Sequence, residues 1–272
     1  MKEALQAPCV LGVDVANQIT RLGLFCNDLL QTSWSVTTPA RITLDEARLT
    51  IKSFLGELNM DCCSKEGNAA QTASIEAILS CVVPDLSNTW FEALRSMSKQ
   101  RPLVVSPGIK TGLHMNYNDP SELGSDRIAD MVAAKNLYGY PLIIVDCDTT
   151  INFQVLDQDG SYVGGLIAPG LALSARALSQ AAARLPIVEL SLPQTVLGKN
   201  TRESIQSGIL RGKAASISGL IEMIWRELDY QTTVILSGEH AELLAPLLSC
   251  DASIGSDLTL IGLYEIYKLN RK

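Results

Sequence analysis

The sequence feature that most constrains the fold is one pattern of residues that occurs in each half of the chain. The apolar run 10–13 ends in Asp14, and the apolar run 142–145 ends in Asp146. In both places a short polar turn and another strand pattern follow. Internal duplication is the economical explanation of this repeat. An accidental recurrence of so common a pattern is the alternative.

Strand and helix patterns alternate along the rest of the chain, which indicates the α/β class because helices then cover sheets. The composition agrees, since 47% of the residues are hydrophobic but only 5% are aromatic. We predict two lobes, residues 1–125 and 126–272. The predicted strands are 10–14, 19–25, 29–37, 77–83, 103–105, 142–146, 151–156, 161–167 and 233–236, and the predicted helices are 43–57, 88–98, 126–137, 172–183, 201–228 and 258–269.

The charge of the chain disfavours nucleic acid as a partner. The net charge is −7, with acidic and basic residues interspersed, and an acidic protein repels a phosphate backbone. No apolar run reaches the roughly 18 residues of a membrane-spanning helix, and residues 1–6 lack the apolar core of a signal peptide. We therefore expect a soluble, cytoplasmic protein that binds neither nucleic acid nor membranes.

The cysteines do not predict a disulfide framework. There are seven of them, an odd number with irregular spacing, and Cys62 and Cys63 are adjacent. Cys9, Cys81 and Cys147 lie in or beside apolar runs, where a reduced cysteine behaves as a small hydrophobic residue. With only two histidines, a histidine-rich zinc site is excluded.

The aspartates at the two strand ends are candidates for binding a phosphate and its cation. A carboxylate fixed by a buried strand suits Mg²⁺, and the tight turn after it offers backbone N–H groups to phosphate oxygens. Asp14 and Asp146 both have this setting, although an aspartate that only caps its strand has it too. The segment 107–112 is rich in turn residues but lacks the Walker spacing, so no P-loop is predicted.

The loop 117–125 leads Asp126 and Arg127 to the start of a predicted helix. A carboxylate within hydrogen-bond reach of an alcohol can deprotonate it, and an arginine binds a carboxylate in bidentate geometry. The structural alternative is a helix cap, formed by Ser125 or Asp126, together with a surface ion pair worth at most about 1 kcal/mol. The glycines of segment 164–170 indicate a close approach of the backbone to a ligand or to another strand.

The order of these motifs resembles that of the type III pantothenate kinases, in the superfamily of acetate kinase, sugar kinases and actin. The resemblance covers nearly the whole chain and includes the family segments GxKTG…Y…NPxExGADR, YxGGxIxPG and GxxTxxSxxSGxxxG. The matching residues are Gly108, Lys110, Thr111, Gly112, Tyr117, Pro120, Glu122, Gly124, Asp126 and Arg127; Tyr162, Gly164, Gly165, Ile167, Pro169 and Gly170; and Gly198, Thr201, Ser204, Ser207, Gly208 and Gly212.

The resemblance implies a duplicated ribonuclease-H-like (actin-like ATPase) fold, with two lobes around a central cleft, in an obligate homodimer. Such enzymes transfer the γ-phosphate of ATP to the primary hydroxyl of pantothenate, the first step towards coenzyme A. Asp126 is then expected to be the general base. The residues expected to hold pantothenate are Tyr117, Gly124, Ser125 and Arg127, with Thr201 reaching the pocket from the partner subunit.

The resemblance also implies roles on the side of the phosphoryl donor. Asp14 is expected to serve Mg²⁺ and phosphate, and Asp146 to help hold a monovalent cation, K⁺ or NH₄⁺. The other residues expected to contact the nucleotide are Val15, Ala16, Asn17, Gln18 and Thr149.

Three donor-side motifs differ from the family pattern. In the motif DxGNT, Ala16 replaces glycine and Gln18 replaces threonine, and the added β-carbon at position 16 crowds a phosphate. In the motif DxGTATT, Asp148 replaces glycine, so a carboxylate lies where phosphate oxygens are expected and repels them. In the motif TGG, Glu239 replaces the second glycine.

Two functions are consistent with these differences. The first is an active pantothenate kinase with an unusual nucleotide site. The second is a non-catalytic paralogue that keeps the dimer and acts as a binding or regulatory protein. The retained Asp14, Asp126, Arg127 and Asp146 favour the kinase, and a sugar kinase is a distant third because its sugar-site signatures are absent.

Overall fold

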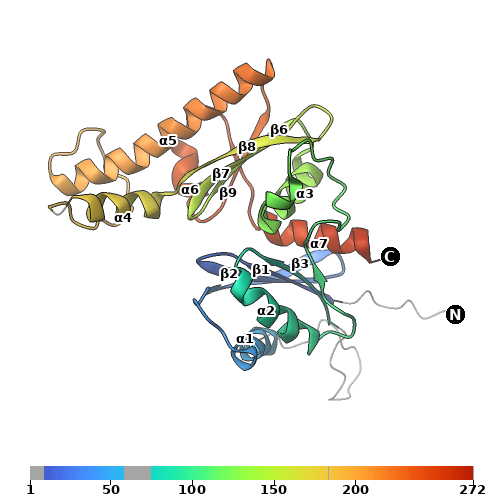
Figure 1. Cartoon of the computed structure of the whole chain (residues 1–272). Coiled ribbons are helices and arrows are strands. Elements are labelled where there is room, and N and C mark those ends of the chain that lie inside the picture. The colour runs from blue at the N-terminus through green and yellow to red at the C-terminus, as the bar shows by residue number, and fades with distance from the viewer. Residues whose placement is uncertain (1–8, 58–74, 183, 272) are drawn as a thin grey trace. The chain divides into compact units, whose positions relative to one another are not determined.

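The computed structural model describes residues 9–57, 75–182 and 184–271 of the chain (Figure 1). The chain forms two compact units, of which the first comprises 1–112, 119–133 and 259–272 and the second comprises 113–118 and 134–258. Our expected division into 1–125 and 126–272 follows the order of the chain. In the structure, the segments 119–133 and 259–272 belong to the first compact unit, and the segment 113–118 belongs to the second.

The first unit contains a five-stranded mixed sheet in the order β3-β2-β1-β4-β5. The strand β1 runs antiparallel to β2 and β2 antiparallel to β3, whereas β4 runs parallel to β1 and β5 parallel to β4. The β2–β3 turn lies at Asn27 and Asp28, which both have positive φ angles, as the favoured two-residue hairpin turn requires. The strands are β1 Cys9–Val15, β2 Ile19–Cys26, β3 Leu29–Thr37, β4 Ile75–Cys81 and β5 Leu103–Val104.

Two helices, α1 (Leu44–Glu57) and α2 (Pro84–Arg95), pack on this sheet. Their buried residues, Trp90 among them, share one core cluster with Leu11 and Val13 of β1. Thr43 caps α1, because the N–H of Glu46 donates to its hydroxyl at 3.3 Å while the Thr43 N–H donates to the Glu46 carboxylate at 2.7 Å. This reciprocal arrangement is a capping box.

The helix predicted at 88–98 is wrong at both ends, since α2 begins at Pro84 and ends at Arg95. The predicted strand 77–83 ends immediately before Pro84, and the predicted helix begins only at Asn88. Proline also favours the first position of a helix, where its missing N–H is not needed. One residue therefore separates the strand from the helix and begins the helix as well.

The second unit repeats the topology of the first. Its sheet has the order β10-β9-β6-β7-β8, with β6 antiparallel to β7, β7 antiparallel to β8, β9 parallel to β6 and β10 parallel to β9. The same strand order in both units confirms the duplication that the sequence indicates. The strands are β6 Leu142–Cys147, β7 Thr150–Leu156, β8 Tyr162–Pro169, β9 Thr233–Ser237 and β10 Ser253–Ile254.

The long helix α5 (Thr201–Leu228) has the bounds that the sequence predicts. Its apolar face packs on the second sheet, where Leu210 and Ile217 share a core cluster with Phe153 of β7. The helix α4 runs alongside α5 (Figure 1). The remaining elements are η1 Pro120–Glu122, α3 Ser125–Tyr138, α4 Leu171–Ala181, α6 Ala241–Leu244, η2 Ala245–Leu247 and α7 Leu258–Asn270.

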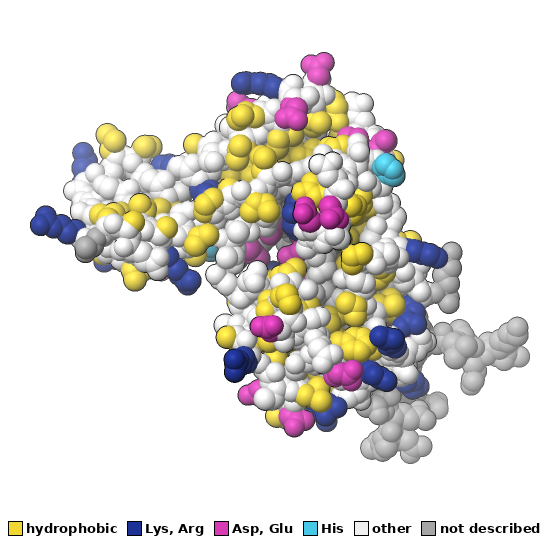
Figure 2. All heavy atoms as spheres, viewed as in Figure 1, with side chains coloured by type: hydrophobic (Ala, Val, Ile, Leu, Met, Phe, Trp, Pro, Cys, Tyr) yellow, Lys and Arg dark blue, Asp and Glu magenta, His cyan; other side chains and the backbone are white. Residues whose placement is uncertain are grey.

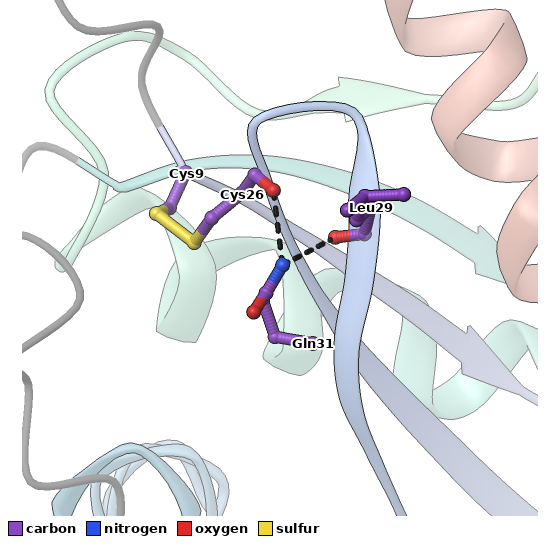
Figure 3. Close-up of a disulfide and its surroundings, with 4 residues drawn as sticks. All are labelled: Cys9, Cys26, Leu29 and Gln31. Carbon is purple, nitrogen blue, oxygen red and sulfur yellow. Dashed lines mark hydrogen bonds between the residues drawn. A yellow bond between two sulfur atoms is a disulfide. The ribbon is translucent and has the colours of Figure 1, made fainter.

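A disulfide joins Cys9 of β1 to Cys26 of β2, and the expectation that Cys9 is reduced is therefore wrong (Figure 3). The register pairs Val10 with Phe25, so the two cysteines face each other one position further along the antiparallel pair. Parity and spacing of cysteines do not reveal such a register. Among the described residues, Cys81, Cys147 and Cys250 are free, and Cys62 and Cys63 lie outside them.

The helices were expected to include no membrane-spanning segment. None of those in the described part of the chain is both long and apolar enough to cross a bilayer. Residues 1–6, which we examined for a signal peptide, lie outside the described residues.

Candidate active site

In the first unit, β1 ends in a buried carboxylate with polar neighbours on both adjacent strands. Asp14 has 1% of its surface exposed, and the Ser80 hydroxyl of β4 donates to its Oδ1 at 2.8 Å. The sheet register places Ser80 on one side of Asp14 and Arg21 of β2 on the other. Neither Ser80 nor Arg21 is predicted as a site residue from the sequence, because only the pairing of the strands brings them to Asp14.

The turn after β1 presents mainly its backbone and two polar side chains. The Val15 side chain is fully buried, so only its backbone is available to a ligand. Asn17 and Gln18 are exposed, and Ala16 is half-buried. The N–H of Ala16 donates to the Ile19 carbonyl at 3.2 Å, which closes the turn tightly.

The start of α3 holds Asp126 at a helix N-terminus, where a carboxylate is stabilised by the helix dipole. The Asp126 Oδ1 accepts a hydrogen bond from the Arg127 N–H at 2.7 Å. A β-carbon on Gly124 would collide with this same oxygen, so a glycine is required for the observed carboxylate position. The Ser125 hydroxyl lies 2.8 Å from that of Ser80.

The helix α3 is also held further along its length. The Thr259 hydroxyl of α7 donates to the buried Asp130 carboxylate at 2.7 Å. A β-carbon on Gly262 would collide with the Ala129 backbone, so the two helices cross at a close backbone contact. Asp126 thus stands on a helix that is fixed within the first unit.

The second unit has a corner equivalent to that of Asp14, built from Asp146, Asp148 and Gly238. Gly238 has a φ of +86°, and a β-carbon there would lie 2.6 Å from the Asp146 Oδ1 and 2.8 Å from the Asp148 Oδ1. The Asp148 Oδ1 accepts a hydrogen bond from the Glu239 N–H at 2.6 Å. Two departures from the family pattern, at 148 and 239, are therefore in direct contact.

The residues next to this corner have structural roles. Burial raises the pKa of the Cys147 thiol, and the nearby Asp146 and Asp148 raise it further, so this thiol stays protonated and is no nucleophile. A β-carbon on Gly170 would collide with the carbonyls of Asp148 and Thr149. The close approach that the sequence indicates at Gly170 is therefore to the chain's own backbone.

Two predicted site residues, Tyr117 and Thr201, belong to the second unit. The ring of Tyr117 lies 5.4 Å from that of Tyr162. Thr201 begins α5 and, with residues of α4 and α5 such as Leu178 and Lys213, lines a cavity of about 720 Å³. Lys213 donates to the Pro169 carbonyl at 2.5 Å, and burial lowers the pKa of its amino group.

The predicted residues thus form groups within each unit. Asp14, Gly124, Ser125, Asp126 and Arg127 belong to the first unit, in which hydrogen bonds through Ser80 connect Asp14 to Ser125. The second unit contains Tyr117, Asp146, Thr149 and Thr201.

Comparison with known proteins shows one family over most of the chain. A family model described as type III pantothenate kinase matches residues 10–223. The type III pantothenate kinase of Brevibacillus brevis is 38% identical over 262 residues, covering 96% of this chain and 99% of that protein. The one from an Exiguobacterium species is 37% identical over 263 residues and covers 97% and 100%.

Solved structures of low sequence identity show the fold. A Baf family protein from Campylobacter jejuni aligns with a TM-score of 0.57 at 18% identity, covering 96% of this chain and 98% of that one. The ethanolamine utilization protein EutJ from Carboxydothermus hydrogenoformans aligns with a TM-score of 0.57 at 12% identity, covering 96% and 91%. The predicted α/β class, with a duplicated actin-like fold, is confirmed.

Proposed function

Since the chain belongs to the type III pantothenate kinase family, which phosphorylates pantothenate with ATP on the way to coenzyme A, we propose that Asp126 is its general base. The observation that carries this proposal is the position of the Asp126 carboxylate at the start of α3. That position depends on the missing β-carbon of Gly124. A carboxylate held there by the fold is prepared to accept a proton from an alcohol.

Asp126 acts on the primary hydroxyl of pantothenate. As the hydroxyl oxygen attacks the γ-phosphorus, its proton passes to the carboxylate, and the bond from phosphorus to the leaving ADP oxygen breaks. General-base help of this kind contributes on the order of 10²–10⁴ in rate. Most of the remaining acceleration of phosphoryl transfer comes from positioning and from cationic groups around the phosphate.

Arg127 and its neighbours hold the acceptor in this proposal. A guanidinium binds the pantothenate carboxylate through two parallel hydrogen bonds, and Arg127 follows Asp126 directly in the chain. The backbone at Gly124 and the Ser125 hydroxyl line the same helix start. Tyr117, whose side chain has 37% of its surface exposed, supplies a flat apolar surface and a hydroxyl.

On the donor side, Asp14 fits a Mg²⁺ ion that arrives with the nucleotide. Mg²⁺ is bound by one or two carboxylates plus substrate phosphates, and β1 offers one carboxylate, with Ser80 engaging one of its oxygens. The bound ion neutralises charge on the phosphates. In this proposal the turn at Val15 and Ala16 and the exposed side chains of Asn17 and Gln18 contact the phosphate oxygens.

Asp146 is the proposed ligand of a monovalent cation, K⁺ or NH₄⁺. Its Oδ1 and that of Asp148 both point towards Gly238, and oxygen ligands suit a hard cation. The cation supplies positive charge beside the phosphates, and Thr149 lies in the turn between the two carboxylates and β7. The carboxylate at position 148 accepts the backbone N–H of Glu239.

This arrangement favours the kinase over the non-catalytic paralogue. In the sequence, Asp148 looks like an uncompensated charge in a phosphate site. In the structure its Oδ1 accepts the Glu239 N–H at 2.6 Å, and a hydrogen bond to an ionised group offsets part of its charge. The Glu239 side chain is exposed, in the turn that follows β9.

We also propose that the functional form is a homodimer that uses the region of α4 and α5. Figure 2 shows apolar side chains together with lysines and arginines over these helices, and exposed apolar patches mark interaction surfaces. A second copy on this surface would bring Thr201 to the partner's pocket. The exposed apolar residues of the region are Leu173, Leu178, Ile187, Leu192, Val196 and Leu197.

The dimer is tested by sedimentation equilibrium of the purified chain. We expect a dimer at assay concentrations, converted to monomer by Leu197→Asp. Leu29→Asp is the matched control, because Leu29 is similarly exposed, at 66% against 75% for Leu197, but lies on the edge strand β3. A parent protein that is monomeric during turnover contradicts the dimer.

The cations are tested in a coupled assay of ADP formation with pantothenate and ATP. We expect turnover that requires Mg²⁺ and increases severalfold when K⁺ or NH₄⁺ replaces Na⁺ at constant ionic strength. Asp146→Asn should remove the preference for K⁺, while Asp251→Asn, at an exposed aspartate of the same unit, should keep it. Equal turnover in K⁺ and Na⁺ contradicts the monovalent site.

A further inference from the structure

A chain of hydrogen bonds in the first unit runs from Asp14 to the first residue of α3. The Ser80 hydroxyl lies 2.8 Å from the Asp14 Oδ1 and 2.8 Å from the Ser125 hydroxyl. Ser80 has no exposed surface and lies opposite Asp14 in the parallel pairing of β1 with β4. No role was expected for Ser80 from the sequence, and it is the residue at the centre of this network.

The directions of the two hydrogen bonds follow from the number of available protons. An ionised carboxylate only accepts, and a serine hydroxyl has one proton to donate. Ser80 therefore donates to Asp14, so its oxygen must accept the proton of Ser125. The bond to the carboxylate is charge-assisted, which makes it stronger than one between neutral groups, and a buried Ser80 has no water with which to exchange it.

The Ser125 bond fixes the end of α3 that carries Asp126. On the next turn of the helix, Asp130 is bound by Thr259 at 2.7 Å, and the Ala129 backbone lies against Gly262. Asp126 lies between these two attachments. The Asp130 attachment alone leaves the first turn free to fray, whereas Ser80 holds that turn against β4.

We propose that Ser80 is a positioning residue of the phosphoryl transfer. It orients the carboxylate of Asp14 on the donor side and, through Ser125, the helix start that carries Asp126 on the acceptor side. It touches no reacting atom, and its contribution is to keep the two carboxylates in one hydrogen-bonded framework. This inference rests on the roles proposed above for Asp14 and Asp126.

The test compares Ser80→Ala with Ser80→Thr and with Thr20→Val. Thr20 is a fully buried hydroxyl of β2 that bonds to Thr38 at 2.8 Å, so its loss matches that of Ser80 without touching Asp14. For each variant, kcat, the KM values, the calorimetric Kd of pantothenate and the melting temperature are measured. Misplacement of a catalytic group by about 1 Å can cost about 100-fold in rate.

We expect Ser80→Ala to lower kcat about 10- to 100-fold. The pantothenate Kd should change less than about threefold, because the substrate contacts remain in place. Ser80→Thr keeps a hydroxyl at position 80 and should therefore have a kcat much closer to that of the parent than Ser80→Ala has. Thr20→Val should lower the melting temperature about as much as Ser80→Ala but keep kcat within about twofold of the parent. A parent-like kcat in Ser80→Ala, or an equal loss of kcat in Thr20→Val, overturns the proposal.

Ser125→Ala keeps the test decisive if Ser80→Ala does not fold. It removes the half-buried Ser125 hydroxyl and leaves Ser80 bound to Asp14, and we expect a several-fold lower kcat with a pantothenate Kd within about threefold of the parent, which distinguishes lost positioning from a lost substrate contact. An unchanged kcat in that variant overturns the proposal. Asp126→Asn, assayed in parallel, distinguishes a failure of the role proposed for Asp126 from a failure of the role proposed for Ser80. If it keeps full turnover, the role of Asp126 is wrong; if it loses turnover while the serine variants do not, only the role of Ser80 is wrong.

Discussion

The carboxylate of Asp148 accepts a hydrogen bond from the backbone N–H of Glu239 at 2.6 Å. These two residues replace glycines of the family pattern in motifs that are far apart in the sequence. The bond joins the side chain of residue 148 to the backbone of residue 239. Asp148 ties the turn after β6 to the turn after β9, and its charge is partly satisfied by the backbone.

Removing the charge of Asp148 while keeping its acceptor oxygen should strengthen ATP binding. Asp148→Asn retains an oxygen for the Glu239 N–H but no longer repels phosphate, so we expect the KM for ATP to fall about three- to tenfold, or about 0.6–1.4 kcal/mol. Steady-state kinetics at saturating pantothenate measure this change. If the KM rises instead, Asp148 serves as an essential cation ligand, and repulsion of phosphate is not its main effect.

A methyl group at position 124 should displace the Asp126 carboxylate, the proposed general base. In Gly124→Ala the new β-carbon collides with the Asp126 Oδ1, so we expect kcat to fall at least about tenfold. Gly56→Ala is the matched control, because a β-carbon at Gly56 meets no atom within 4 Å. Unchanged kcat in Gly124→Ala would mean that the observed carboxylate position is not the one used in catalysis.

Reduction of the Cys9–Cys26 disulfide should lower stability. The bond links residues 17 positions apart in the sequence, and closing a loop of about that size contributes on the order of 3 kcal/mol. Urea unfolding of the parent with and without a reductant measures this difference, and Cys26→Ser should lose the response to reductant. If all seven thiols of the non-reduced, denatured parent react with a thiol reagent, the disulfide does not form.

The stability of the first unit should fall at alkaline pH because of two buried tyrosines. Burial, and then the hydrogen bond to Asp28 at 2.7 Å, raise the pKa of Tyr264. Burial and then Glu76 raise the pKa of Tyr267 in the same way. A raised pKa in the folded state means that the contribution to stability is complete below the unfolded value of about 10 and is lost as the pH rises above it.

Urea unfolding between pH 8 and pH 11 tests this pH dependence. The free energy of unfolding should be nearly constant up to about pH 10 and then decline. Tyr264→Phe combined with Tyr267→Phe should make the decline shallower. An equally steep decline in the double variant assigns the alkaline transition to other groups.

Patterns that depend on near neighbours in the sequence were predictable. The helix predicted at 201–228 is α5, Thr201–Leu228, and the two strand–aspartate patterns correspond to β1 and β6. The start of α2 was mispredicted because Pro84 can end a strand or begin a helix, and local sequence does not decide between them. The α/β class and the family follow from the ordered motifs.

Features that depend on strand register were not predictable. Ser80 and Arg21 reach Asp14 only through the pairing of β1 with β4 and β2. Cys9 and Cys26 meet only because β1 and β2 pair in one particular register. The contact between Asp148 and Glu239 likewise requires β6 and β9 to be adjacent, although 91 positions separate the two residues in the sequence.

The most direct test of the account is the turnover of Asp126→Asn against that of Asp45→Asn. Both aspartates belong to the first unit and each is the second residue of a 14-residue helix, so loss of a helix-dipole interaction affects both variants alike. Removal of a general base alone predicts a kcat about 10²–10⁴ lower in Asp126→Asn, with pantothenate binding retained by calorimetry, and parent-like kcat in Asp45→Asn. Asp126→Asn with kcat within about threefold of the parent would contradict the assignment of Asp126 as the general base.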